Sequence, residues 1–272
     1  MPTPSEWGAP VLMGRKHNVR LALATVIATT AVMTGVAPAY AETAGVDELA
    51  TVVSVEENAD GTFGATIYTP ATGVKAEDLA RSLTASGVPN VSVKREGEIG
   101  TMAVAPCSLG IARTWPSNTT CFVRWSYNGA ARPIINFVDH SSARWPVGRS
   151  VTEWNKTSGI DSIYRTKAAG CDGGPAHCVN VYSGNYGRNG WLGKTYVVWN
   201  SAQTYFESAR VELNNSYGGA EVVDWATACH ELGHVLGLGH NNAKSSCMYK
   251  EDAAGVSKYP HADDRKLLER YY

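Results

Sequence analysis

The chain has 272 residues, with 24 Lys and Arg against 25 Asp and Glu and a formal net charge of −1. This balance offers no basic surface for nucleic acid, so we expect no nucleic-acid partner. The length allows one domain of ordinary size with additional segments.

The first 41 residues have the features of a secretory signal. Three basic residues between positions 15 and 20 precede an uncharged apolar run at 21–36, and Ala39 and Ala41 form an A-x-A cleavage pattern. An uncleaved membrane anchor is the alternative, but the run is shorter than the roughly 20 residues that span a bilayer. We therefore expect residues 1–41 to be removed, leaving a secreted protein with no membrane attachment.

Residues 42–105 differ in composition from the rest, because they contain no cysteine, tryptophan or histidine. Two β-rich runs flank an Asp-Gly pair within 50–69, which predicts a hairpin. A short helix is predicted within 74–88 and a third strand within 90–96. The segment is thus predicted to form a small β-β-α-β module, either a propeptide or an accessory domain, with a linker at 97–106.

The remaining residues, 106–272, alternate between strand and helix patterns and predict an α/β domain. Asp224 is a candidate N-cap for the second of the three helices predicted here. The predicted strands are 131–139, 161–167, 178–184, 191–199 and 208–217, and the predicted helices are 142–159, 225–236 and 263–272.

Six cysteines all follow the signal segment, and their number is even. Export makes disulfides the expected state, with free buried thiols as the alternative. Fifteen pairings are open to six cysteines. Proximity in the sequence favours Cys107–Cys121, Cys171–Cys178 and Cys229–Cys247.

The stretch CHELGHVLGLGHN, residues 229–241, places three of the seven histidines within eleven residues. On a helix, His230 and His234 lie one turn apart on the same face and can bind one metal ion. Glu231 is rotated by about 100° around the axis, where it can reach a water molecule on that ion. Gly237 can end the helix with a positive φ, and this lets His240 return to the same metal.

Three nitrogen ligands leave one tetrahedral position open, which is typical of a catalytic zinc site. The pattern H-E-x-x-H-x-x-G-x-x-H fixes five positions. A chance match in a chain of this length is on the order of one in 100,000. The alternative is a group of hydrogen-bonded histidines in a glycine-rich loop.

This stretch resembles the zinc-binding motif of the metzincin metalloproteases. Met248, eight residues after His240, matches the methionine that forms an apolar floor below the metal in that family. Met248-Tyr249 and the acidic pair Asp263-Asp264 in the closing helix are similar to those of matrixins and their bacterial relatives. The resemblance covers roughly residues 131–272 and implies a zincin-like fold: a mixed twisted sheet with an active-site helix and a C-terminal helix.

The resemblance also implies a catalytic domain over residues 106–272 that hydrolyses peptide bonds. Zinc would be bound by His230, His234 and His240, and a zinc-activated water would use Glu231 as general base. A monomer is expected. Residues 191–199 resemble the family's edge strand, so a protein or peptide substrate is expected to bind along them as an extra antiparallel strand. A zinc hydrolase of non-peptide bonds and a binding protein without activity are the alternatives.

Several details bear on this resemblance. Matrixin propeptides often use a cysteine to occupy the zinc, but APCSLG around Cys107 does not match that motif, so a disulfide is favoured. Cys229 and Cys247 directly precede His230 and Met248, and their bridge would restrain the metal site. Asp172 is a candidate calcium ligand, but no EF-hand spacing supports calcium. Finally, His140, His177 and His261 are interpreted as surface or loop residues rather than ligands.

Overall fold

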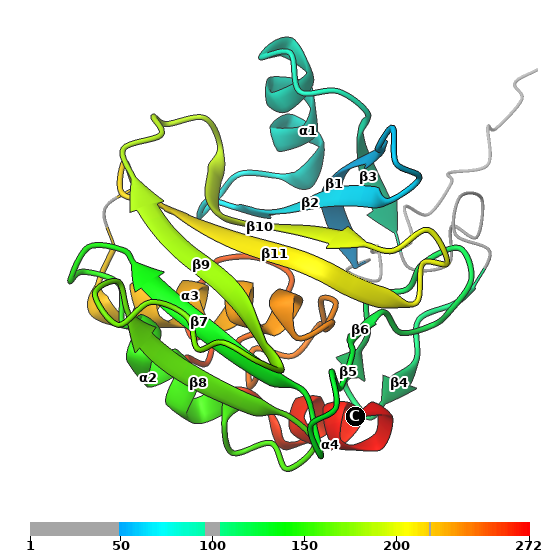
Figure 1. Ribbon diagram of the computed structural model, residues 1–272. Coiled ribbons are helices and arrows are strands. Elements are labelled where there is room, and N and C mark those ends of the chain that lie inside the picture. The colour runs from blue at the N-terminus through cyan, green and yellow to red at the C-terminus, as the bar shows by residue number, and fades with distance from the viewer. Residues whose placement is uncertain (1–48, 96–103, 218) are drawn as a thin grey trace, which may run out of the picture. The chain divides into compact units, whose positions relative to one another are not determined.

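The computed structural model describes residues 49–95, 104–217 and 219–272 (Figure 1). These residues fall in one compact unit, Gly45–Tyr272. The predicted signal segment lies outside the described residues, as does most of the predicted linker. Across the described ranges, no helix combines the length and the apolar character needed to span a membrane.

Among the described residues, nine strands form one mixed sheet in the order β3-β1-β2-β10-β11-β9-β7-β8, with β6 paired to β11. The strands from β3 to β11 pair antiparallel, and β11, β9, β7 and β8 pair parallel. The strands are β1 (Ala50–Glu57), β2 (Phe63–Pro70), β3 (Val91–Arg95), β6 (Arg124–Trp125), β7 (Ile134–His140), β8 (Asp161–Thr166), β9 (Ala176–Gly184), β10 (Trp191–Trp199) and β11 (Tyr205–Asn214); β4 (Ser108–Leu109) and β5 (Ala112–Arg113) form a separate pair.

The first elements of the described chain are the predicted β-β-α-β arrangement. Helix α1 (Ala76–Ala85) buries Leu79 and Leu83 against β1 and β3. It ends where Gly87 takes a φ of +85°, a conformation that glycine adopts without strain. The local patterns therefore determine this part, whereas the division of the chain near residue 105 stays a prediction.

Side chains of the β1–β2 hairpin alternate between two different cores. Val52 and Tyr68, which are paired across the hairpin, pack with the buried leucines of α1. Their neighbours Val53 and Ile67 are also paired, and both belong to the large core of the molecule. Because successive residues of a strand point to opposite faces, the hairpin joins one core to the other.

Three further helices belong to the rest of the structure: α2 (Val147–Trp154), α3 (Glu221–Val235) and α4 (Ala262–Tyr271). Helix α3 packs on β10 and β11, and α2 packs between α3 and β8. The indole of Trp154 is fully buried and donates to the carbonyl oxygen of Cys229 at 2.9 Å. The predicted mixed α/β fold, with a central helix and a closing helix, is confirmed.

The predicted N-cap of α3 is wrong. The helix starts at Glu221 after Ala220, so Asp224 lies within the first turn. Its carboxylate is 3% exposed and accepts two hydrogen bonds, at 2.7 and 2.6 Å, from the Arg144 guanidinium. The carboxylate therefore binds Arg144, 80 residues away in the sequence, instead of accepting from the backbone amides of its own helix as predicted.

All three predicted disulfides are present: Cys107–Cys121, Cys171–Cys178 and Cys229–Cys247. Each one closes a short loop, with sequence separations of 14, 7 and 18 residues. All of them lie between residues 107 and 247, so no disulfide joins the β-β-α-β segment to the rest.

Candidate metal centre

His230, His234 and His240 come together beneath the sheet, the first two from α3 and the third from the loop that follows it. His230 Nε2 lies 2.9 Å from His234 Nε2 and 3.1 Å from His240 Nε2. The side chains are 3%, 1% and 5% exposed. Among the described residues, these three histidines form the one group of acidic, histidine or cysteine side chains that lie close enough together to hold a metal ion.

Two glycines shape the loop that returns His240 to the helix. Gly237 has a φ of +96° and ends the helix as predicted, with its amide donating to the His234 carbonyl oxygen at 3.0 Å. Gly239 allows a close approach between two backbone segments. A Cβ at this position would lie 2.9 Å from the Thr114 carbonyl oxygen, so Gly239 allows the loop to pack tightly against that backbone.

The second ring nitrogen of each histidine faces an oxygen atom. An Nδ1–H that donates to such an oxygen leaves the Nε2 lone pair free, which is the tautomer that binds a metal through Nε2. The Nδ1 partners are Cys247 O at 2.7 Å for His230, Leu238 O at 2.8 Å for His234 and Thr51 Oγ1 at 2.9 Å for His240.

Burial keeps the three imidazoles neutral. It lowers the pKa of His230 to about 4, and it lowers the pKa values of His234 and His240 well below the ordinary histidine value. Mutual repulsion among the rings adds to this lowering for His234 and His240. Three neutral nitrogens that converge without any acidic group between them fit a zinc ion, which accepts three histidines and leaves one position open.

Glu231 lies between the helix and strand β10, with no exposed surface. Thr69 donates to Oε1 and Thr195 to Oε2, both at 2.6 Å. Desolvation raises the pKa of Glu231 to about 7, although both hydroxyls act in the opposite direction. A Cβ at Gly193 would sit 2.4 Å from Oε1, so only glycine lets the carboxylate approach β10 this closely.

Met248 lies next to the helix that carries the first two histidines. Its side chain is fully buried, and a Cβ at Gly233 would be 2.2 Å from its Sδ atom. The missing side chain of Gly233 therefore leaves the space that Met248 fills. This position agrees with the apolar floor that the resemblance implies.

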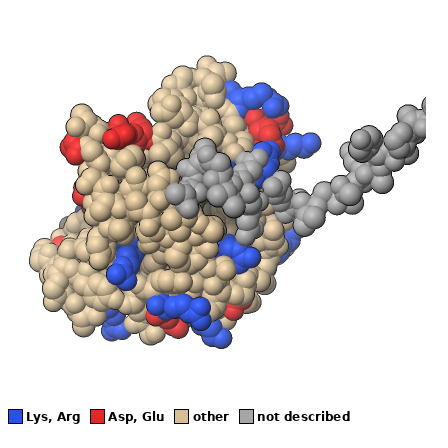
Figure 2. Space-filling view, turned by 90° about the vertical axis from the view of Figure 1, so that its right-hand side faces the viewer, with Lys and Arg blue, Asp and Glu red and all other residues tan. Residues whose placement is uncertain are grey.

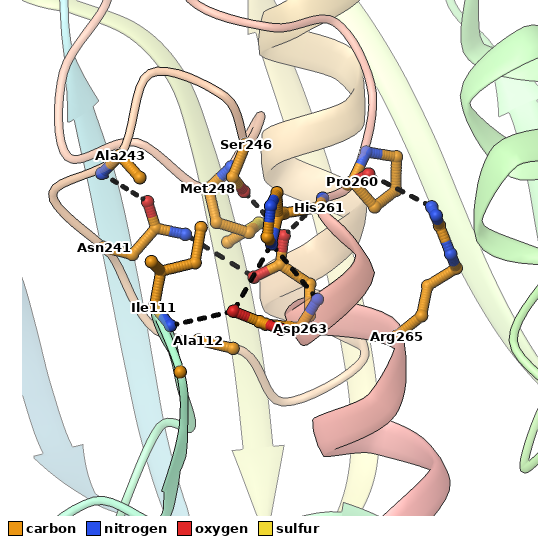
Figure 3. A network of polar contacts seen from close by, with 12 residues as sticks. Ile111, Ala112, Asn241, Ala243, Ser246, Met248, Pro260, His261, Asp263 and Arg265 are labelled. Carbon is orange, nitrogen blue, oxygen red and sulfur yellow. Dashed lines mark hydrogen bonds and ion pairs between the residues drawn. The ribbon is translucent and has the colours of Figure 1, made fainter.

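A polar network from α4 holds the turn that carries Met248 in place (Figure 3). Asp264 accepts from Ser246 Oγ at 2.6 Å and from the His261 amide at 2.8 Å. Ser246 Oγ accepts in turn from the Met248 amide at 2.9 Å. Burial raises the pKa of the Asp264 carboxyl, while its hydrogen-bond donors lower it. The neighbouring Asp263 instead accepts from the Ile111 amide at 3.1 Å, which ties α4 to the turn between β4 and β5.

Strand β10 was expected to be an edge strand, and this is wrong. It pairs with β11 on one side and antiparallel with β2 on the other, from Trp199↔Phe63 to Trp191↔Pro70 (Figure 1). The β-β-α-β segment supplies that neighbour, and nothing in the local sequence of β10 indicated it. Any strand added to this side of β10 must take the place of β2.

A small pocket adjoins the histidines on the side where β2 ends. Its lining includes Thr69, Thr227, His230 and Tyr249, together with the partly buried carboxylate of Asp252. The hydroxyl of Thr72, just past the end of β2, donates to that carboxylate. Residues from the β-β-α-β segment therefore contact both the histidine cluster and the pocket beside it.

The remaining candidate ligands have other partners. Asp172 forms an ion pair with Arg165, and His140 stacks on Tyr182. His261 begins α4, where its ring accepts from the Asp263 amide. His177 Nε2 lies 2.8 Å from the Ser126 carbonyl oxygen. His140 and His177 lie in strands β7 and β9 and His261 directly precedes α4, and all three are partly buried rather than exposed.

Sequence reasoning missed the residues that surround Glu231. Thr69, Thr195 and Gly193 contact it from strands that are 162 and 36–38 positions away, and Thr51 contacts His240 from 189 positions away. The alternating pattern of each strand showed that these residues share a face with buried neighbours. It could not show which side of the sheet would receive α3.

Charges on the visible face are dispersed. In Figure 2, basic and acidic side chains are scattered among uncharged residues, without one continuous basic surface on that face.

Comparison with protein families gives a match to the matrixin model over residues 183–272, about one third of the chain. This segment contains β10, β11, α3 and α4, together with the whole histidine motif. The match confirms the predicted resemblance to metzincin metalloproteases over these residues. A comparison with curated proteins found no match.

Two solved structures are similar to the chain at low levels. An archaemetzincin from Methanopyrus kandleri has 15% identity and a TM-score of 0.34, covering 52% of this chain and 96% of its own. Metalloproteinase-II from Bacteroides fragilis has 13% identity and a TM-score of 0.32, covering 80% and 81%. At these TM-scores, neither likeness supports an assignment of fold or function.

Proposed function

We propose that this chain is a secreted zinc-dependent endopeptidase. The observation that carries the proposal is the convergence of three buried, neutral histidine nitrogens, 2.9 and 3.1 Å from His230 Nε2, beside the buried carboxylate of Glu231. The matrixin match over the same segment supports a zinc-dependent peptidase in general terms. Three disulfides support a location outside the reducing cytoplasm.

His230, His234 and His240 would hold the zinc, which supplies a Lewis acid for polarising the scissile carbonyl. Glu231 acts as the general base: it accepts a proton from the attacking water and gives it to the leaving amine. A carboxyl with a pKa of about 7 is suited to both transfers near neutral pH. Thr195 holds Oε2, so that Oε1, which accepts from Thr69 in this structure, would face the reacting water once β2 is absent.

A peptide substrate would bind as an extended strand antiparallel to β10, because main-chain hydrogen bonds along a sheet edge are a general means of binding peptides. This binding requires the β2 position to be free. Zinc content and cleavage of casein by the zinc-loaded protein test the proposal, with Glu231→Gln as the critical variant and the exposed Glu207→Gln as its matched control.

One zinc per chain is expected in all three proteins. Once the β2 position is free, the parent and Glu207→Gln are expected to cleave casein until a chelator is added, and Glu231→Gln is expected not to cleave it. Turnover retained by Glu231→Gln would rule out its role as base. Cleavage of ester substrates without any peptide cleavage, after the β2 position has been vacated, would favour a zinc hydrolase acting on another bond.

A further inference from the structure

The β1–β2 hairpin occupies the position that a peptide substrate needs under the proposed function. β2 runs antiparallel to β10 and pairs along its length, with Ile67 opposite Thr195 and Thr69 opposite Gly193. An extended substrate added to β10 would make the same kind of pairing. The chain therefore places its own residues in the substrate position.

The same hairpin contacts the catalytic groups directly. Thr69 donates to Glu231 Oε1 at 2.6 Å, while Thr195 donates to Oε2 at the same distance. Both carboxylate oxygens thus already accept a hydrogen bond, and Thr69 stands where a water molecule would approach. Thr51 lies 2.9 Å from His240 Nδ1, on the same face of the hairpin.

Apolar packing extends this cover. Val53 and Ile67, on the face that carries both threonines, have no exposed surface and belong to the main core. Beyond the end of β2, the hydroxyl of Thr72 binds the Asp252 carboxylate in the adjoining pocket. The hairpin thus covers a continuous path from His240 past Glu231 to that pocket.

The covering segment also has a core of its own. Leu79 and Leu83 pack with Val52 and Tyr68, and this cluster is separate from the main core. One residue from beyond the segment, Trp191 of β10, joins it. All three disulfides lie elsewhere, so pairing, packing and hydroxyl contacts attach the segment to the rest of the structure.

We propose that residues 49–95, here called the inhibitor module, are a built-in inhibitor in which β2 takes the place of the substrate strand and Thr69 engages the catalytic base. The proposal rests on the proposed function for the identity of the blocked site. The inhibitor module contains no cysteine, so its action depends on strand pairing and a hydroxyl rather than on a thiol at the metal. The opposing possibility is that these strands are a permanent part of the enzyme, with Thr51 supporting His240.

Cleavage between the inhibitor module and the rest of the full chain separates these possibilities. A recognition sequence for a site-specific protease is inserted between residues 95 and 104, and the zinc-loaded protein is cut and then diluted. A linked module acts at an effective concentration on the order of millimolar, which cutting removes. Two quantities are measured: casein turnover, and the Kd of a fluorescent peptide hydroxamate, which binds zinc in an open cleft whether or not catalysis occurs.

At every dilution, the uncut protein is expected to hydrolyse casein slowly and to bind the probe weakly. After cutting, turnover and probe affinity should both rise at least about tenfold on dilution to nanomolar concentrations. Both should fall again when the cut sample is concentrated. Hydrogen exchange of the β10 amides should become faster in parallel, since their β2 partners leave.

Paired substitutions in the uncut protein test the contact at Glu231. Thr69→Val removes the hydroxyl but keeps the shape, and it should tighten probe binding by about tenfold, the typical effect of losing a hydrogen bond to a charged group. Thr66→Val makes the same change on the same strand, but on the opposite face, and should leave probe binding unaltered.

The outcomes separate this inference from the proposed function. Probe affinity that rises on dilution without casein turnover would support the inhibitor module and refute the peptidase. Equal turnover and probe affinity before and after cutting would overturn the inhibitor. Loss of zinc and of probe binding when the parts separate would also overturn it, because the strands would then be a fixed component of the metal centre.

Discussion

The strands β3, β1 and β2 share one sheet with β10, β11, β9, β7 and β8, but different forces hold the two ends together. The first end has short antiparallel connections, one helix and exposed ion pairs such as Arg81–Asp78. The second end has three disulfides and the buried Arg144–Asp224 pair. One end is thus fixed by covalent and buried polar links, and the other by packing and strand pairing.

This difference teaches where the molecule can come apart. Surface ion pairs contribute at most about 1 kcal/mol, whereas a disulfide contributes several times more. The boundary between β2 and β10, where the inhibitor module meets the rest, has no disulfide across it and depends on strand pairing and packing. The metal centre lies at this boundary, since Glu231 accepts from Thr69 on one side and from Thr195 on the other.

The largest expected effect comes from the core of the inhibitor module. Leu79→Ala should destabilise the module by about 3–5 kcal/mol, because Leu79 is fully buried in that cluster. Hydrogen exchange followed by mass spectrometry should show α1 and β1 to β3 opening first, with the rest unchanged. Ser82→Ala, an exposed change on the same helix, is the control. A single cooperative transition that moves as a whole would remove the distinction between the two ends.

The disulfides at the other end should differ among themselves. Replacing both Cys229 and Cys247 by alanine should cost about 3 kcal/mol, against about 2 kcal/mol for Cys171 and Cys178, because the first pair closes a loop of 18 residues and the second one of 7. Urea denaturation measures both.

Zinc affinity sharpens the same prediction. Only the first double substitution should weaken zinc binding, by about 10–100-fold, because the carbonyl of Cys247 orients His230. Equal zinc affinities in the two double variants would show that this bridge does not restrain the metal centre.

The smallest effect, for each group and each pH unit, is the pH dependence of the stability of the metal-free protein. The buried histidines have lowered pKa values, so the unfolded chain binds their protons first, and stability is lost as pH falls below about 6.5. Each contributes about 1.4 kcal/mol per pH unit, continuing for His230 to about pH 4. Glu231 acts oppositely: its pKa is raised to about 7, so its own contribution falls as pH rises toward 7.

Three histidines outweigh one glutamate, so chelator-treated protein should be less stable to urea at pH 5 than at pH 7. Glu231→Gln removes the opposing group and should make the loss steeper. Equal stability at both pH values, in the parent and in this variant, would show that the histidine cluster is open to water without its metal.

Much of the site could be predicted because its information is local. His230, His234, Gly237 and His240 lie within one helix and the following loop, where spacing determines geometry. The disulfides also join near neighbours, so proximity was sufficient to pair them. The longer strands and the helices followed from periodicity, with shifts of a few residues at their ends, whereas the two-residue strands β4, β5 and β6 were not predicted.

The failures concern contacts between distant segments. Aspartate is a residue type typical of N-caps, yet the Arg144 guanidinium is a stronger hydrogen-bond partner than backbone amides for the buried Asp224 carboxylate. The pairing of β2 with β10 depends on main-chain hydrogen bonds, which carry no residue signature. Thr51 and Thr69 look like ordinary strand residues until the sheet brings them over the histidines.

Side chains along β2 alternate between the two faces of the sheet. Odd-numbered positions such as Ile67 and Thr69 face the metal centre, and even-numbered ones such as Tyr68 face α1. Adding or deleting one residue ahead of them within the strand would exchange the two sets, moving a tyrosine over Glu231 and a threonine into an apolar core. Adding or deleting two residues would keep each side chain on its present face of the sheet. Descendants of this sequence should therefore vary the length of β2 in steps of two, and should exchange the residues facing α1 more freely than those facing the histidines.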